Sequence, residues 1–391
     1  MTTTADTTNT PDLELIRATT RELARKFDYE YWLDCDKNHK YPWDFVNAFA
    51  EGGWLGAMIP EEYGGIGLGL QEAAVMMGEI SASGGGMSGG SAIHFYVFPP
   101  APIVRYGSEE MKRKYLPKLA AGELLSAFGI TEPTAGVDTS RIKTKATKVD
   151  GGWLVNGQKV FITNAQNAKR IVLLARTSPR DEAKPLAGMT LFYAEMDPEH
   201  VTVREIDKLG RAAIDTNELF IDNLFVADED VVGEVGKGFY YIIDGLNPER
   251  IVVAMEGVGL GRAALEIGTE YAKNRVVFDR PIGKNQAVAH PLADSWIRLQ
   301  AAEQVAMHAA KLFDEHKDCG HEAAAAKYLG AEAGFEACDR AFSTLGGYAY
   351  AKEYHIERLW REVRLLRNAP FSQEMVRNYI SQQVLGLPRS Y

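Results

Sequence analysis

The pattern of hydrophobic and polar residues changes twice along the chain. Up to residue 125, apolar residues recur at helical spacing and are interrupted by Gly/Pro loops such as residues 59–69. A stretch of short runs rich in β-branched and aromatic residues follows, separated by turn residues, and the remainder is rich in Ala, Leu and Glu at helical spacing. The pattern predicts an α+β protein with an N-terminal helical domain (1–125), a middle β domain (126–234) and a C-terminal helical domain (235–391) in which strands are absent.

Composition narrows the class of protein. The chain has 391 residues, enough for two or three domains, and a formal net charge of -10, which argues against a nucleic-acid partner. Cys35, Cys319 and Cys338 lie far apart, so we expect reduced thiols in a cytoplasmic protein. The most apolar long run, residues 91–104, contains a histidine and three prolines, so no membrane segment is expected. We expect the polar first ten residues to be a frayed tail rather than a signal peptide.

Two segments of the middle domain have the composition of a cofactor site. Residues 129–138, GITEPTAGVD, form a predicted bend whose backbone N–H groups suit an anionic or acceptor-rich group. Residues 159–165, KVFITNA, offer a flat aromatic side chain, Phe161, beside the hydroxyl of Thr163. Together the segments predict a site for a planar cofactor with polar edges.

A second pattern imitates a different cofactor site. Gly259, Gly261 and Ala264 match the G-x-G-x-x-A fingerprint of nicotinamide dinucleotide binding within 259-GLGRAA-264, and Asp279 follows at about the expected spacing. A nicotinamide-dependent dehydrogenase is therefore an alternative. A glycine-containing helix with close neighbours is favoured, because only helical patterns follow Asp279.

Two other stretches favour ordinary structural roles. His316, Cys319 and His321 come together in a polar loop, but no second ligand pair at zinc spacing accompanies them, so no metal site is expected. The glycine-rich run 83–91 lacks the Lys-Ser/Thr of a phosphate loop, and a flexible connection is expected there.

The two middle-domain motifs resemble those of the acyl-CoA dehydrogenase family. Further matches extend over nearly the whole chain, at residues 59–69, 106–123, 233–239, 274–286 and 346–364. The resemblance implies an N-terminal helical domain, a middle β-sandwich or barrel and a C-terminal four-helix bundle. It also implies FAD as cofactor, an acyl-CoA substrate, an electron-transfer flavoprotein as partner and a homotetramer.

The resemblance assigns the cofactor contacts residue by residue. The implied FAD-binding residues are Phe128, Ile130, Thr131, Val137, Phe161, Thr163, Arg275, Phe278, Gln286, Gly346, Gly347, Ser372 and Glu374. Phe161 stands where the family commonly has tryptophan and preserves an apolar shield, whereas Val137 replaces a hydroxyl residue near the diphosphate. Gly346 and Gly347 are implied to approach the cofactor of a neighbouring subunit.

The resemblance also leaves one position for the catalytic base. Most of the family carries this glutamate near the C-terminus, where this chain has Pro370, and Glu374 one turn further on is a poor substitute. A minority, including isovaleryl-CoA and long-chain acyl-CoA dehydrogenases, carries it directly before an arginine, as Glu249 stands before Arg250. Glu249 is therefore the expected base. The alternative is a glutamate in a first helical turn, with Asn247 as N-cap, favoured only by the helix dipole.

The implied substrate contacts are Ser91, His94, Val137, Asn247 and Arg250. A histidine packed within a helix is the competing interpretation of His94. The function that follows is FAD-dependent α,β-dehydrogenation of an acyl-CoA to the trans-2-enoyl-CoA, with electrons passed to an electron-transfer flavoprotein. Within the same fold, an enoyl-CoA reductase, a flavin monooxygenase and an inactive flavin-binding paralogue remain alternatives.

Overall fold

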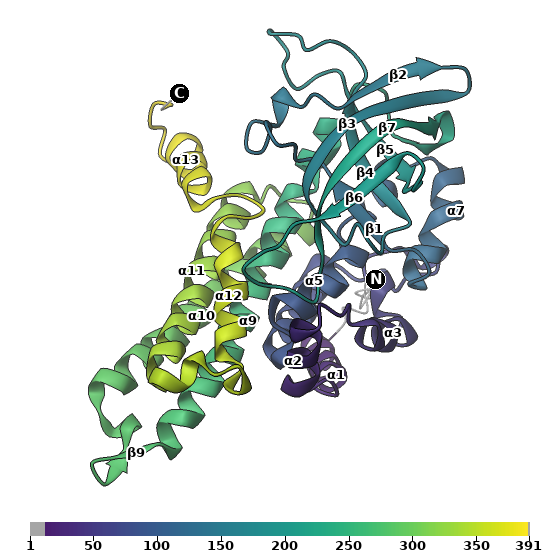
Figure 1. Ribbon diagram of the computed structural model, residues 1–391. Coiled ribbons are helices and arrows are strands. Elements are labelled where there is room, and N and C mark those ends of the chain that lie inside the picture. Colours follow the sequence, from purple (N-terminus) through teal and green to yellow (C-terminus); the bar gives the residue numbers. More distant parts are fainter. Residues whose placement is uncertain (1–11, 390–391) are drawn as a thin grey trace, which may run out of the picture.

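The computed structural model describes residues 12–389, so the predicted tail at the N-terminus lies outside the described residues. The chain forms helices, then a sheet, then helices again, which confirms the predicted order (Figure 1). The N-terminal helices are α1 (Leu13–Ala24), α2 (Tyr29–Lys37), α3 (Trp43–Glu51), α4 (Leu70–Ile80), α5 (Gly86–Val97), α6 (Ala101–Tyr106) and α7 (Glu109–Ala120). Side chains of Asp12, Asp28 and Ser108 cap α1, α2 and α7 by accepting backbone N–H groups that the helix leaves unpaired.

The glycine-rich run 83–91 is a buried part of the helical domain, so the expectation of a flexible connection was wrong. A π-helical turn, Ser81–Gly85, leads directly into α5. The glycines are needed for close packing rather than for mobility. A Cβ on Gly86, which has φ +57, would lie 2.5 Å from the Glu362 carboxylate, and one on Gly89 would lie 3.3 Å from the Trp32 ring.

The middle domain is a twisted, mostly antiparallel sheet. Its strands run in the order β6-β7-β3-β2-β4-β5-β8, and β1 pairs in parallel with β4. The strands are β1 (Ser126–Gly129), β2 (Lys145–Val149), β3 (Gly152–Thr163), β4 (Arg170–Arg176), β5 (Met189–Glu195), β6 (Val201–Glu205), β7 (Thr216–Ala227) and β8 (Val231–Val232). The β3–β7 register shifts between Lys159 and Ile162, where Phe161 has φ +60. This bulge turns the end of β3 and leaves the Phe161 side chain 66% exposed.

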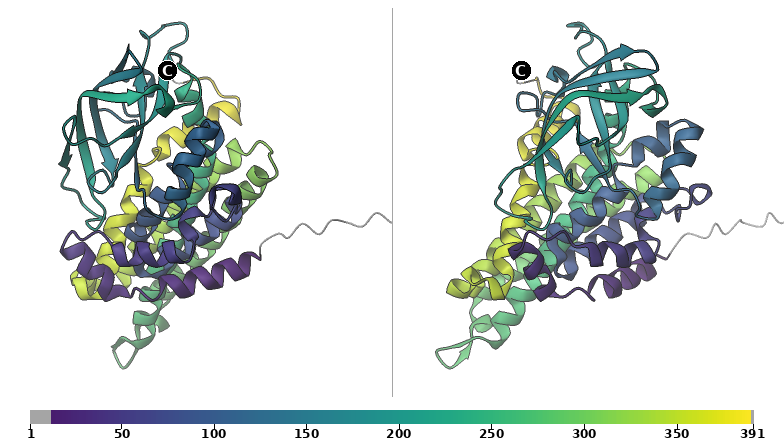
Figure 2. Two further views of the ribbon diagram at one scale, coloured as in Figure 1. Left: turned by 90° about the vertical axis from the view of Figure 1, so that its right-hand side faces the viewer. Right: turned by 45° about the vertical axis from the view of Figure 1, so that its right-hand side comes forward.

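The C-terminal domain is a bundle of long helices that extends along both other domains (Figures 1 and 2). Its helices are α8 (Gly238–Asp244), α9 (Leu246–Asn274), α10 (Gln286–Asp314), α11 (Gly320–Leu345), α12 (Ile356–Val363) and α13 (Gln373–Gln383). Apolar side chains of α4 and α9, such as Met76, Met77 and Met255, share one core. That shared core fixes the N-terminal helices on the bundle.

The dinucleotide-like glycines lie inside α9, so that alternative was wrong. A Cβ on Gly259 would lie 2.1 Å from the Gly78 carbonyl oxygen, and one on Gly261 would lie 3.0 Å from Gly334 in α11. These glycines let α4 and α11 approach α9 closely, and the residues directly before them belong to α9 itself rather than to a strand.

The expectation that strands are absent after residue 234 was also wrong. A small hairpin of β9 (Val276–Val277) and β10 (Arg280–Pro281) joins α9 to α10, at the end of the bundle away from the sheet (Figure 2). Strands of two residues are too short to show an alternating pattern. Within the described residues, no helix is long and apolar enough to cross a membrane.

Candidate active site

His94 lies between two carboxylates of α9. Its Nε2 is 2.9 Å from Oε2 of Glu249, and its Nδ1 is 3.0 Å from Oε1 of Glu256. The two glutamates are seven residues apart, about two helical turns, so they face α5 from the same side of α9. The Glu249 side chain is 12% exposed, whereas that of Glu256 is fully buried.

Electrostatics favour the charged form of His94. Burial alone would lower the pKa of its imidazole, but Glu249 and Glu256 outweigh that cost and raise the pKa well above its ordinary value. A carboxylate only accepts hydrogen bonds, so both contacts are hydrogen bonds at once when both ring nitrogens carry a hydrogen. The site therefore holds one imidazolium between two carboxylates.

Contacts from α5 connect this group to the middle domain. Nη1 of Arg211 donates to Oγ of Ser91 at 2.8 Å, and Nη2 of Arg211 lies 3.4 Å from Oγ1 of Thr163 at the end of β3. On the other side, the ring of Phe98 lies 5.6 Å from that of His94 and 4.9 Å from that of Phe128 in β1. Both cofactor motifs are thus joined to the helix that carries His94.

A buried ion pair joins the two cofactor motifs to each other. Nζ of Lys159 donates to Oε1 of Glu132 and to the carbonyl of Ile130, both at 3.0 Å. Burial lowers the pKa of Lys159 to about 8, although Glu132 opposes the shift. Burial would raise the pKa of Glu132, but Lys159 and the backbone N–H groups of residues 143 and 144 outweigh it and lower that pKa.

The middle-domain surface beside this pair fits a flat cofactor. Phe161 and Val137 are 66% and 70% exposed, an unusual degree for apolar side chains that flank a buried motif. Ile130 and Thr131 are half-buried, and N–H of Val160 donates to the carbonyl of Thr131 at 3.0 Å. An apolar ledge next to backbone and hydroxyl groups suits the ring and polar edge of FAD.

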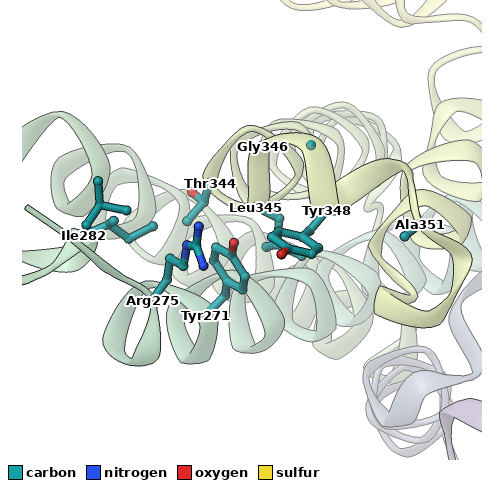
Figure 3. Close-up of a pocket in the computed structure, with 10 residues that line it drawn as sticks. Tyr271, Arg275, Ile282, Thr344, Leu345, Gly346, Tyr348 and Ala351 are labelled. Carbon is teal, nitrogen blue, oxygen red and sulfur yellow. The ribbon is translucent and has the colours of Figure 1, made fainter.

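Five other predicted cofactor residues lie at the far end of the bundle. A cavity of about 490 Å³ is lined there by Arg275, Gly346 and Gly347 together with Tyr271 and Tyr348 (Figure 3). Nothing lies within 4 Å of a Cβ placed on either glycine, so this backbone is open to a ligand or to another chain. Phe278, at the hairpin turn, is 94% exposed, and Gln286 begins α10.

The C-terminal candidates lie on a third part of the surface. Ser372 caps α13 by accepting the N–H of Met375 at 3.3 Å, and Glu374 has a side chain that is 74% exposed, 3.7 Å from Arg377. Pro370 follows a cis peptide bond. The chain therefore provides Glu374 as an exposed carboxylate rather than an enclosed one.

Arg250 lies between aromatic rings near this segment. Its guanidinium is 4.8 Å from the Phe371 ring centre and 5.6 Å from that of Tyr379. Nη1 donates to Oδ1 of Asn247 at 3.0 Å, and burial lowers the pKa of the guanidinium. Asn247 lies within α9, after the cap residue Gly245, so the alternative was wrong in making it the N-cap, although Glu249 does lie in the first turn of α9.

Three features define the class: the helix–sheet–helix order, the surface suited to a flavin, and an enclosed carboxylate linked to it. They are those of a flavoprotein oxidoreductase. Sequence models of the acyl-CoA dehydrogenase N-terminal, middle and C-terminal domains match residues 10–123, 127–224 and 236–385. The chain therefore belongs to the acyl-CoA dehydrogenase family, whose cofactor is FAD, as the sequence predicted.

Individual relatives agree with this assignment. The acyl-CoA dehydrogenase FadE12 of Mycobacterium tuberculosis is 35% identical over 97% of this chain and 100% of its own. The mitochondrial isovaleryl-CoA dehydrogenase of Oryza sativa subsp. japonica is 37% identical over 84% and 80% of the two chains. The crystal structure of an acyl-CoA dehydrogenase from Geobacillus kaustophilus matches with a TM-score of 0.90 and 31% identity, over 98% of this chain and 100% of that one.

Sequence reasoning missed two residues of the site. Glu256 is a single carboxylate in the apolar run 251–261, and that isolation was the available sign of a buried partner. Arg211 comes from the loop between β6 and β7 and has φ +58. Its reach to Ser91 depends on how two domains meet, and no local pattern indicates that.

Proposed function

We propose that the protein oxidises the Cα–Cβ bond of an acyl-CoA thioester to the trans-2-enoyl-CoA, with Glu249 as the base, and delivers the electrons to an electron-transfer flavoprotein. The observation that carries the proposal is the enclosed carboxylate of Glu249, held 2.9 Å from His94. The alternative carboxylate, Glu374, is exposed, and Pro370 cannot accept a proton.

The proposed role of Glu249 is to accept the proton of the substrate α carbon. Oε2 is bonded to His94, and no hydrogen bond to Oε1 is found among the described residues, so Oε1 is open to the substrate. FAD, when bound, supplies the two-electron acceptor for the hydride that leaves the β carbon. A double bond then joins the two carbons, and the proton remains on Glu249.

Other residues are proposed to bind the acyl-CoA and to shield the flavin. Arg250, held by Asn247, presents a half-buried cation with an unpaired Nε that can contact the polar part of the acyl-CoA. The rings of Phe95 and Phe98 lie 5.7 and 5.6 Å from that of His94, which favours a short or branched acyl group. On the middle domain, Phe161 is proposed to shield the flavin ring from water.

The oligomer proposed from the sequence has support at the far end of the bundle. The hairpin turn exposes Val276, Val277 and Phe278, and the open glycines Gly346 and Gly347 lie beside it. Exposed apolar side chains next to an open cavity favour contact with another copy of the chain. We propose that a neighbouring subunit completes the FAD site there, within a homotetramer.

An acyl-CoA panel tests the reaction. Purified holoenzyme is mixed without oxygen with saturated acyl-CoAs of short, branched and long chains, and flavin absorbance and product mass are followed. We expect bleaching by a short or branched substrate and a product lighter by two hydrogens. Reoxidation is then tested with an electron-transfer flavoprotein. Reoxidation only by an enoyl-CoA would indicate a reductase, and rapid turnover with oxygen alone would indicate an oxidase or monooxygenase.

A further inference from the structure

Glu249, the proposed base, belongs to a buried group of three side chains in which His94 lies between Glu249 and Glu256. His94 is 6% exposed and Glu256 is fully buried, and each ring nitrogen meets a different carboxylate. A buried carboxylate is costly unless it is paired. Oε2 of Glu256 has no hydrogen-bond partner in the described part of the chain, so His94 is the cation that is hydrogen-bonded to this carboxylate, while Arg211 couples to it only electrostatically.

We propose that His94 is a positioning residue that fixes the carboxylate of Glu249 and places a positive charge against it, and that Glu256 in turn fixes the imidazole of His94. The proposal rests on the role of Glu249 proposed above. The arrangement has the logic of a histidine oriented by a carboxylate, with one difference. Here the histidine carries a hydrogen on each ring nitrogen and donates to Oε2 of Glu249. Oε1 of Glu249 therefore stays available to the substrate.

The charge of the imidazolium has a direct consequence for the base. A cation 2.9 Å away favours the ionised form of Glu249, which is the form that accepts a proton. Without that cation, the buried carboxylate of Glu256 would keep only its electrostatic coupling to Arg211, which makes no hydrogen bond to it among the described residues. In a variant without that cation, we therefore expect hydrogen exchange at the substrate α carbon to require a higher pH.

Other charged groups around α5 do not replace this function. Arg211 reaches α5 from the β6–β7 loop and donates to Ser91. From α12, Glu362 accepts hydrogen bonds from Ser88 at 2.6 and 3.1 Å and is paired with Arg358. Arg211 is coupled electrostatically to Glu256, but its printed hydrogen bonds go to hydroxyl groups, so His94 is the cation in contact with Glu249.

The test follows proton removal apart from hydride transfer. A 3-thia-acyl-CoA, in which sulfur replaces the β carbon, is incubated with holoenzyme in deuterated water, and exchange of its α hydrogens is measured by mass from about pH 5 to 9. The variants are His94→Gln, Glu256→Gln and Glu249→Gln. His355→Gln is the matched control, because His355 is another enclosed histidine beside a glutamate, 3.4 Å from Glu30, and it precedes α12 rather than lying on α5. FAD content and thermal stability are measured for every variant.

The acid limb of the exchange profile is the pH range in which exchange slows as pH falls. For His94→Gln we expect this limb to shift to higher pH by about one to three units. Exchange at pH 6 should fall at least about tenfold, while exchange at pH 9 should stay within about threefold of wild type. Glu256→Gln removes a negative charge from the group, so its acid limb should stay or move to lower pH. His355→Gln should leave the profile unchanged.

An unchanged acid limb in a folded, FAD-loaded His94→Gln protein would overturn the proposal, as would a pH-independent loss of rate. If His94→Gln does not fold, Glu256→Gln decides, because an upward shift of its acid limb contradicts the assigned charges. Glu249→Gln distinguishes a failure of the proposed base from a failure of the role proposed for His94. Exchange that persists in Glu249→Gln refutes the proposed base, whereas its loss together with a normal His94→Gln profile refutes only the role of His94.

Discussion

Nζ of Lys159 lies 3.0 Å from Oε1 of Glu132, and both side chains are almost completely buried. This contact joins β3 to the bend that follows β1, so it sets the position of one cofactor motif relative to the other. The Glu132 carboxylate also accepts the N–H groups of residues 143 and 144. The bend is therefore held by its glutamate and not only by its proline and glycine.

Replacing Lys159 with Met tests this contact. The variant leaves the Glu132 carboxylate buried without its cation, so we expect a loss of about 3 to 5 kcal/mol in the free energy of unfolding. FAD should also be lost more readily on dilution. Lys148→Met is the control, because Lys148 pairs with Asp228 on the exposed side of the same sheet and should have little effect. Urea unfolding of both variants checks the prediction, and equal effects would contradict it.

Arg211 is expected to support FAD binding without taking part in proton or hydride transfer. It joins Ser91 of α5 to Thr163 at the end of β3, so Arg211→Gln should loosen the cofactor surface. We expect FAD affinity to fall about tenfold, the effect of losing a hydrogen bond to a charged group. Flavin fluorescence on dilution measures it. Arg204→Gln, on the exposed side of β6, should bind FAD like wild type, and an Arg211→Gln protein that does so too would refute this role.

The hairpin turn is expected to be a contact between subunits. Phe278 is 94% exposed, so Phe278→Ser removes an apolar side chain that the isolated chain does not bury. We expect the molar mass measured by light scattering to decrease at low protein concentration. Phe225→Ser, at a 50% exposed position on β7, should leave the mass unchanged. An unaltered mass in Phe278→Ser would exclude the hairpin from the interface.

Stability should depend on pH through His94. The pKa of His94 is raised in the folded protein, so its ion pairs stabilise the folded state. This stabilisation is complete at pH values below the pKa of an unfolded histidine, about 6.5, and is lost as pH rises through the pKa of His94 in the folded protein. The difference in unfolding free energy between wild type and His94→Gln should therefore shrink above about pH 6.5.

The matched histidine predicts the opposite trend. Burial lowers the pKa of His355, so its contribution is present above about pH 6.5 and is lost as pH falls below that value. The difference between wild type and His355→Gln should grow as pH rises from about 5 to 7. Urea unfolding at several pH values measures both differences. A His94 difference that grows with pH would contradict the imidazolium.

The sequence predicted the order of helices and strands because each long segment carries its own periodicity. It also predicted the family and FAD, because the motifs around Thr131 and Phe161 are local. It did not predict the fold of residues 83–91, where a run of glycines is helical only because Trp32 and Glu362 pack against it. Local composition favoured a flexible segment, and tertiary packing outweighed it.

The site was predictable only in part for a similar reason. Glu249 could be proposed from its place before Arg250, together with Pro370 at the usual position of the base. Its partner Glu256 lies on the same face of α9 two turns later, but no local pattern indicated that His94 would lie between them. That contact depends on the packing of α5 against α9, which joins residues more than 150 positions apart.

The most direct test of the account compares two carboxylates in one experiment. Glu249→Gln and Glu374→Gln holoenzymes are mixed without oxygen with the acyl-CoA that bleaches the wild-type flavin fastest, and the single-turnover rate is recorded. The account predicts that bleaching slows by at least about a thousandfold in Glu249→Gln, because the step loses its base, and changes little in Glu374→Gln. Rapid bleaching of Glu249→Gln, or a comparable loss in Glu374→Gln, would contradict it.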